Sequence, residues 1–330
     1  MGRGGLPVTA AKNEMPVFKR PLKKRIKRAL RRPFEWLGIC LGIVVFVNLP
    51  RRWMLGVCDL VSAVMYRVDG RGRRRSLANL RVVCGKLRNP DGVIIPVSRY
   101  NPTRAEELVI RRSYRNMART VGHAFWTCRN ALERVKSAGE MSEAGKKFLA
   151  ANNPAVTVSG HIGCWEILSQ LALIEGHFMM SVAKDIGTGG MTKLLMKART
   201  SIGQEIVHAD GAFRPLMQGL KKGKSLGLLV DQVVEPQNGG VWVEFFGMPV
   251  PVSAAPAFFS AKGKAPIVIA WSRPLHDGRW RCEIISVHGA DEARDVRGMT
   301  QKCISQLERV IRRHPSCWVL NYNYFRMHYA

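Results

Sequence analysis

Residues 155–173, AVTVSGHIGCWEILSQLAL, join a short apolar run, a histidine between glycines and an amphipathic stretch that carries a glutamate. The run 155–159 is apolar and β-branched, which predicts a buried strand. From Trp165 onward apolar residues recur at helical spacing, which predicts a helix. Strand, turn and helix in this order are typical of α/β folds, which place their chemistry at strand ends. His161 is therefore a candidate site residue.

Glu166 follows His161 by five residues. On one continuous helix this spacing would point the two side chains about 140° apart. They can meet only if His161 lies in the turn and Glu166 in the first helical turn, which the glycines favour. A carboxylate that holds an imidazole in one tautomer makes it a general base. Alternatively, His161 is a helix cap or a core residue, since this spacing also arises by chance.

The 330 residues suffice for one large domain or two small ones, and their charge is unusual. Fifty-two Lys and Arg against 24 Asp and Glu give a net charge of +28, which points to anionic partners. A hydrophobic content of 46% excludes a disordered basic tail protein. The eight cysteines form no C-x-x-C pair and no Cys/His cluster at zinc spacing, so we expect reduced thiols and no metal site.

The N-terminal part predicts an anchor followed by a catalytic domain. We expect residues 1–32 to be a basic, disordered segment, 33–66 an apolar, helical, membrane-anchoring region, and 67–330 the catalytic domain. The uncharged run 36–49 has fourteen residues, fewer than the roughly 20 that span a bilayer, so a buried core helix is an alternative. No small-residue cleavage site follows, which argues against a signal peptide.

Two more apolar strands are predicted to end at polar residues. One ends at Lys184, and Arg199 follows fifteen residues later, after a segment with helical spacing. The other, 225–230, ends in Asp231 and Gln232, a site candidate by the same topological argument as His161. Without further context, Lys184 and Arg199 are as well explained as solvated surface charges.

In their order and spacing these segments resemble the bacterial late acyltransferases of lipid A synthesis, within the lysophospholipid acyltransferase superfamily. The resemblance covers roughly residues 30–326. The family's H-x4-(D/E) motif matches His161 and Glu166. Further matches are Lys184, Arg199, Asp231, Gln232, Phe245, Phe246, Gly247, Pro249, Ser253 and Trp318. The chain departs from the family in having lysine at 184 for the usual arginine and Asn and Tyr after Trp318 for Lys and Arg, which leaves the recognised headgroup open.

The resemblance implies an α/β fold, a single domain with a mixed β-sheet flanked by helices, plus an N-terminal membrane-anchoring helix. It implies transfer of a fatty acyl chain from acyl carrier protein to a hydroxyl of a lipid A precursor or related membrane glycolipid. The acceptor is then an anionic lipid at the membrane surface, and the enzyme works on the cytoplasmic face of the inner membrane. No cofactor and no metal are implied.

The resemblance also implies roles for single residues. His161 would take the proton of the acceptor hydroxyl, Glu166 would orient the imidazole, and the alkoxide would attack the thioester without an acyl-enzyme. Arg199 and Lys184 would hold acceptor phosphates or offset negative charge, and Asp231 would position one of these two. Phe245 and Phe246 are predicted either as an acyl-chain wall or as plain core aromatics.

Two other functions are alternatives. A sister acyltransferase would use acyl-CoA on a phosphoinositide mannoside or an aminolipid, which the departures after Trp318 allow. A non-catalytic basic protein would bind a membrane surface or nucleic acid. Nucleic acid is not expected as a partner, because the aromatic residues are not interleaved with the basic runs.

Overall fold

The computed structural model describes residues 44–86, 100–151, 154–183, 196, 199–200 and 203–325. The chain divides into two compact units, residues 1–45 and 46–330, and every element named below belongs to the second. The basic segment 1–32, residues 33–43, Lys184 and Arg326 lie outside the described residues. The boundary predicted at residue 32 lies outside the described residues, and the one predicted at residue 66 falls inside the helix Arg51–Val68, so both stay predictions.

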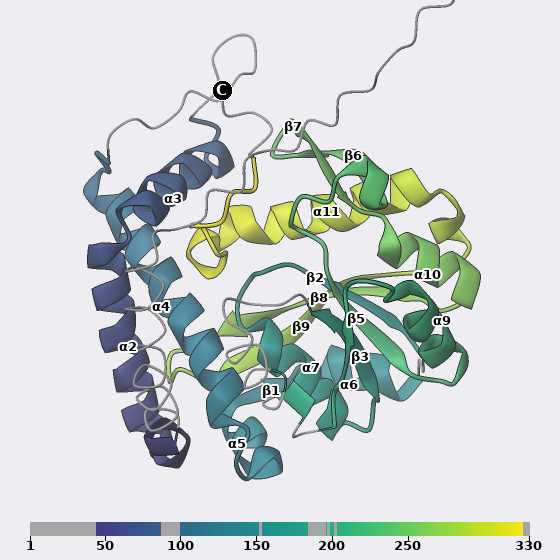
Figure 1. Ribbon diagram of the computed structural model, residues 1–330, viewed down its shortest axis with the longest axis horizontal. Coiled ribbons are helices and arrows are strands. Elements are labelled where there is room, and N and C mark those ends of the chain that lie inside the picture. Colours follow the sequence, from purple (N-terminus) through teal and green to yellow (C-terminus); the bar gives the residue numbers. More distant parts are fainter. Residues whose placement is uncertain are drawn as a thin grey trace, which may run out of the picture. The chain divides into compact units, whose positions relative to one another are not determined.

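Seven strands form one sheet in the order β1-β9-β8-β2-β5-β3-β4 (Figure 1). Neighbouring strands run parallel except β8 and β9, which are antiparallel. The strands are β1 (Gly139–Met141), β2 (Val156–Ser159), β3 (Met179–Ala183), β4 (Glu205–His208), β5 (Ser225–Leu229), β8 (Ile267–Pro274) and β9 (Trp280–His288). A separate antiparallel hairpin is formed by β6 (Gly240–Phe245) and β7 (Met248–Ser253).

Helices cover both faces of this sheet (Figure 1). The described helices are α2 (Arg51–Val68), α3 (Gly70–Val83), α4 (Arg104–Trp126), α5 (Ala131–Ala138), α6 (Glu143–Ala151), α7 (Trp165–Ile174), α9 (Phe213–Lys221), α10 (Ala255–Gly263) and α11 (Val296–Arg313). Short 3-10 turns are η1 (Pro236–Asn238), η2 (Glu292–Arg294) and η3 (Pro315–Cys317). The mixed sheet flanked by helices confirms the α/β part of the predicted fold class, whereas the N-terminal membrane-anchoring helix stays a prediction.

Strand β8 shows why the sheet needs helices on both sides. Side chains alternate between the two faces of a strand. Ile267 and Ile269 belong to the core cluster that includes residues of α10 and α11, whereas Ala270 packs with residues of α7. Both faces are therefore buried, which explains the continuous apolar run at this position in the sequence.

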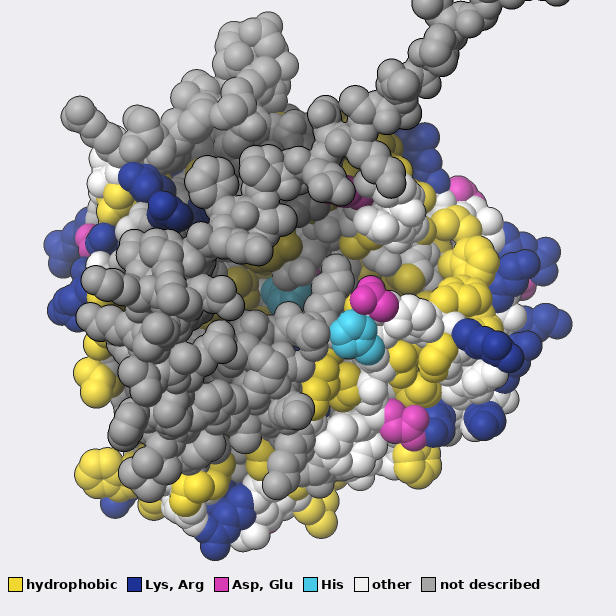
Figure 2. Space-filling view, in the orientation of Figure 1, with side chains coloured by type: hydrophobic (Ala, Val, Ile, Leu, Met, Phe, Trp, Pro, Cys, Tyr) yellow, Lys and Arg dark blue, Asp and Glu magenta, His cyan; other side chains and the backbone are white. Residues whose placement is uncertain are grey.

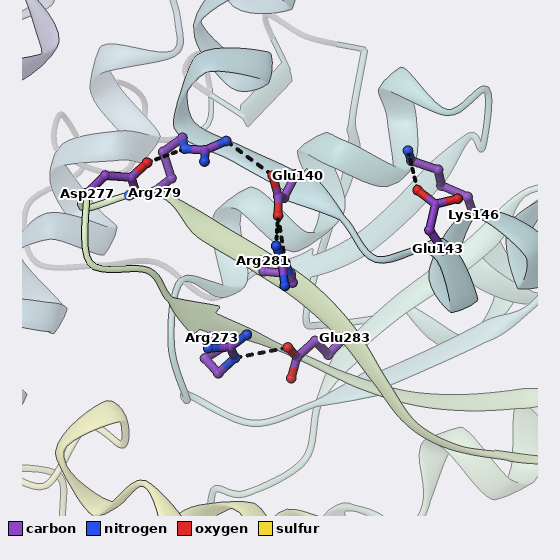
Figure 3. A network of polar contacts seen from close by, with 8 residues as sticks. All are labelled: Glu140, Glu143, Lys146, Arg273, Asp277, Arg279, Arg281 and Glu283. Carbon is purple, nitrogen blue, oxygen red and sulfur yellow. Dashed lines mark hydrogen bonds and ion pairs between the residues drawn. The ribbon is translucent and has the colours of Figure 1, made fainter.

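Ion pairs fasten the β1 edge of the sheet (Figure 3). Glu140 of β1 accepts hydrogen bonds from Arg279, directly before β9, at 3.1 Å and from Arg281 of β9 at 2.6 Å. Arg273 of β8 donates to Glu283 of β9 at 2.9 Å. These side chains are partly exposed, so solvent screens each pair and each contributes little to stability.

Helices α2 and α4 pack closely against each other. Met54, Cys58, Ser62 and Tyr66, spaced by four, form the buried row of α2. At Gly122 of α4 a Cβ atom would lie 2.3 Å from the sulfur of Cys58, so a glycine permits the contact. Helix α4 begins with a capping box, in which Thr103 and Glu106 bond each other's backbone N–H. Among the described helices, α2 included, none is long and apolar enough to cross a membrane.

Candidate active site

His161 lies in the turn between β2 and α7, as predicted. The turn requires glycine at position 163 and leaves little room for a side chain at position 160. Gly163 has φ +64°, and a Cβ there would lie 1.8 Å from the carbonyl oxygen of Ser272. A Cβ at Gly160 would lie 3.1 Å from the carboxyl group of Asp231. The two glycines thus allow the chain to turn between β8 and the end of β5.

Asp231 follows β5, the parallel neighbour of β2, and holds the imidazole of His161. Its Oδ1 lies 2.7 Å from Nδ1 of His161, and its Oδ2 accepts the His161 backbone N–H at 2.8 Å. The indole N–H of Trp318 donates to the same Oδ2 at 2.9 Å. The carboxylate is fully buried and meets three donors, whereas the His161 side chain is 21% exposed.

These contacts keep Asp231 ionised despite its burial. Burial alone would raise the pKa of Asp231, but the charge and hydrogen bonds of His161, together with the Trp318 hydrogen bond, lower this pKa below its ordinary value. An ionised Asp231 accepts the Nδ1 proton of His161 and leaves Nε2 as the basic nitrogen. The side-chain amide nitrogen of Gln232 lies 3.3 Å from Nε2 and donates to it.

Glu166 lies in the first turn of α7, as predicted, but it does not hold the imidazole. Both of its carboxylate oxygens bond the guanidinium of Arg199, one of them at 2.9 Å from Nε, and the indole N–H of Trp165 donates to it at 3.1 Å. The expected contact between Glu166 and His161 is therefore wrong. Asp231 takes that place because the parallel pairing of β2 and β5 brings their ends together.

Arg199 forms a nearly buried pair with Glu166, the two side chains being 15% and 7% exposed. Burial disfavours the charged guanidinium, but the hydrogen bond and charge of Glu166 raise the pKa of Arg199 above its ordinary value. The two groups neutralise each other. The structure thus gives Arg199 a carboxylate partner, while its expected contact with an acceptor phosphate stays a prediction, as does that of Lys184.

Phe245 and Phe246 lie in an aromatic cluster with Trp318 and are fully buried. Each ring centroid lies 5.7 Å from that of Trp318. Of the two interpretations of these phenylalanines, the burial favours core aromatics, and an acyl-chain wall stays a prediction. Together they support the indole that bonds Asp231.

Trp318 and Trp165 are site residues whose contacts the sequence did not predict. Trp318 bonds Asp231 across 87 positions of chain, and no local pattern reports such a contact. The ring of Trp165 packs edge-on against His161, with centroids 5.0 Å apart. The only hint of this contact in the sequence is that Trp165 directly precedes Glu166.

Within the described part of the chain, no group of three or more His, Cys, Asp or Glu could hold a metal ion.

Comparison with known proteins identifies the family. A family model described as bacterial lipid A biosynthesis acyltransferase matches residues 21–326, almost the whole chain. A sequence comparison with curated proteins finds no match. The matched region contains His161, Asp231, Glu166 and Arg199, and so the entire site described above. The chain therefore belongs to the bacterial lipid A biosynthesis acyltransferases, a family of membrane-associated enzymes that transfer an acyl chain from a donor to a lipid A precursor.

Proposed function

We propose that the protein transfers a fatty acyl chain from acyl carrier protein to a hydroxyl of a lipid A precursor, with His161 as general base and Asp231 as its orienting carboxylate. The bond between Nδ1 of His161 and the buried Asp231 supports this assignment, because it orients a partly exposed ring and directs Nε2 away from the carboxylate, toward a substrate.

The proposed reaction needs no acyl-enzyme. The acceptor hydroxyl replaces the amide of Gln232 at Nε2 of His161 and gives up its proton there. The alkoxide oxygen forms a bond to the thioester carbon, and the tetrahedral intermediate expels the donor thiolate. His161 returns the proton to that thiolate. A general base of this kind contributes about 10²- to 10⁴-fold to the rate.

Asp231 is proposed to stabilise the imidazolium that forms at His161. Its carboxylate is buried and ionised, so a positive charge on the ring is attracted in a region of low dielectric constant. Trp318 fixes the carboxylate oxygen that does not face the ring. This assignment transfers to Asp231 the orienting role that the motif spacing predicted for Glu166.

Glu166 and Arg199 are proposed to support the site rather than to react. Their bidentate pair connects the start of α7 to residue 199. Arg199 is proposed to contact an acceptor phosphate through the guanidinium N–H groups that Glu166 does not use, and Lys184 is proposed to bind a second oxygen of such a group.

The donor and the location are part of the same proposal. A net charge of +28 suits both an acidic carrier protein and an anionic lipid surface. We propose that the protein works at the cytoplasmic face of the inner membrane, where both substrates meet. Acyl-CoA is the competing donor, and the experiment below separates the two.

The test is acyl transfer by the purified full-length protein, with a lipid A precursor as acceptor and mass spectrometry of the product. We expect one added acyl chain with acyl carrier protein as donor, and a rate at least about 10² lower for His161→Ala. Transfer from acyl-CoA but not from acyl carrier protein would identify acyl-CoA as the donor. An unaffected rate in His161→Ala would refute the proposed base.

A further inference from the structure

Helix α2 has a second apolar face, next to the row that packs on α4. Six of its residues have between 41% and 71% of their surface exposed: Trp53, Leu60, Val61, Val64, Met65 and Val68. We call these six residues the α2 apolar face. At 100° per residue they occupy about 140° of the helix circumference. A helix in contact with water carries polar residues on such a face, and large exposed apolar patches mark binding surfaces.

The surroundings of this face are strongly basic. Residues 51–83 contain eight arginines and two aspartates. Both aspartates already have partners, because Asp59 pairs with Arg119 at 2.7 Å and Asp69 accepts from Gly72 N–H at 2.8 Å. Figure 2 shows Lys and Arg side chains beside hydrophobic ones along the edge that α2 forms in Figure 1.

Three arginines of α3 are free to bind an anion. Arg71, Arg74 and Arg75 are exposed, and none of them has a hydrogen bond or ion pair with another residue of the described part of the chain. Arg52 and Arg67, also exposed, lie near the two ends of α2. Cations next to an apolar helix face are the combination that binds an anionic bilayer, since the side chains enter the acyl boundary and the arginines meet phosphates.

We propose that α2 lies in the plane of an anionic lipid bilayer, with the α2 apolar face in the acyl boundary and Arg71, Arg74 and Arg75 on lipid phosphates. A second copy of the chain is a poorer occupant, because it would bring two arginine-rich surfaces together. An 18-residue helix is about 27 Å long, which gives an extended contact parallel to the surface.

The contacts of α4 connect this surface to the site. Arg119 of α4 pairs with Asp59 of α2, and the neighbouring Thr120 donates to the carbonyl oxygen of Gly163 at 3.0 Å. Ser113 of α4 donates to the carbonyl oxygen of Trp318 at 2.6 Å. Only the layer of α4 therefore separates α2 from the turn of His161. This docking goes beyond the proposed reaction, and it depends on that reaction only in that the acceptor is a membrane lipid.

The test is flotation of the purified full-length protein with vesicles of phosphatidylcholine, with and without phosphatidylglycerol. The variant is Leu60→Glu with Val64→Glu, at side chains 66% and 49% exposed. The matched control is Leu132→Glu with Val287→Glu, on α5 and β9, at 59% and 47%. We expect the α2 variant to lose at least about tenfold in vesicle partition and the control to stay within about twofold. Equal partition of the two variants would overturn the proposal.

Two further measurements separate the parts of the proposal. Replacing Arg71, Arg74 and Arg75 by Gln should lower partition at least about tenfold only on vesicles with phosphatidylglycerol. Brominated lipids should quench the tryptophan fluorescence of the wild type more than that of Trp53→Phe. Equal quenching of the two proteins would exclude α2 from the acyl boundary. His161→Ala should bind vesicles as the wild type does, so a failed reaction and a failed docking are distinguishable. If the α2 variant binds vesicles as the wild type does, and the wild type is a dimer that this variant fails to form, the α2 apolar face binds a second copy of the chain and the proposal is overturned.

Discussion

Two carboxylates near His161 have different partners, and the difference decides their roles. Asp231 is fully buried and receives the imidazole, a backbone N–H and an indole N–H. Glu166 lies in the first turn of α7, and its oxygens bond Arg199 and Trp165. At the scale of single residues, Asp231 is the group that responds to charge on His161, and Glu166 is the group that compensates Arg199.

Asparagine at position 231 and glutamine at position 166 should therefore act differently. Asp231→Asn removes the charge opposite the imidazolium and the acceptor that fixes its tautomer, so we expect kcat to fall about 10²- to 10⁴-fold with KM little changed. Glu166→Gln leaves the guanidinium of Arg199 nearly buried without its counter-charge, so we expect a loss of about 3 kcal/mol in the free energy of unfolding. Steady-state kinetics and urea unfolding of both variants measure these effects.

The opposite pattern would restore the assignment that the motif spacing suggests. It would consist of a folded Glu166→Gln variant with a kcat loss as large as that expected for Asp231→Asn, together with an Asp231→Asn variant of nearly normal kcat. Glu166→Asp serves as the control, since it keeps the charge and shortens the reach to Arg199.

At the scale of elements, α4 contains a buried histidine that titrates outside the site. His123 is fully buried, its Nδ1 donates to the Arg119 carbonyl at 2.8 Å, and its Nε2 has no partner among the described residues. Burial lowers the pKa of His123 from 6.5 to about 4. Between these two pH values the unfolded chain binds a proton that the folded chain does not, so stability falls as the pH falls.

We expect His123 to contribute about 2 kcal/mol to the loss of unfolding free energy between pH 7 and pH 5. Urea unfolding at both pH values measures that loss, and His123→Phe, which keeps an aromatic ring beside Trp126 and Trp280, is the comparison. The variant should lose about 2 kcal/mol less than the wild type over the same interval. Equal losses in the two proteins would show that His123 is not the titrating group.

The elements of this fold follow closely from local sequence, whereas the contacts of the site do not. The strands at 155–159 and 225–230, the helix from Trp165 and the capping box of Thr103 were all predictable, because periodicity and capping chemistry act within a few residues. The partner of His161 could not be predicted, because it depends on which strands are neighbours in the sheet. Asp231 was a candidate through its strand end, but its contact requires the pairing of β2 with β5.

At the scale of the whole molecule, three layers lie in sequence: the exposed face of α2, the helix α4, and the turn that carries His161. The α2 and α3 region, residues 51–83, carries eight arginines against two aspartates, and a lipid surface would need this positive charge. His161 and Asp231 lie at the carboxyl ends of two parallel strands, where α/β proteins bind their substrates. This order would bring a membrane-bound acceptor to the base without removing the lipid from the bilayer.

The most direct test is mass spectrometry of lipid A from cells that lack this gene and carry either the wild-type chain or His161→Ala. We expect lipid A to be one acyl chain short without the gene, complete with the wild-type chain, and still one chain short with His161→Ala. Lipid A of unchanged mass without the gene, or its completion by His161→Ala, would contradict acylation of a lipid A precursor by a base at His161.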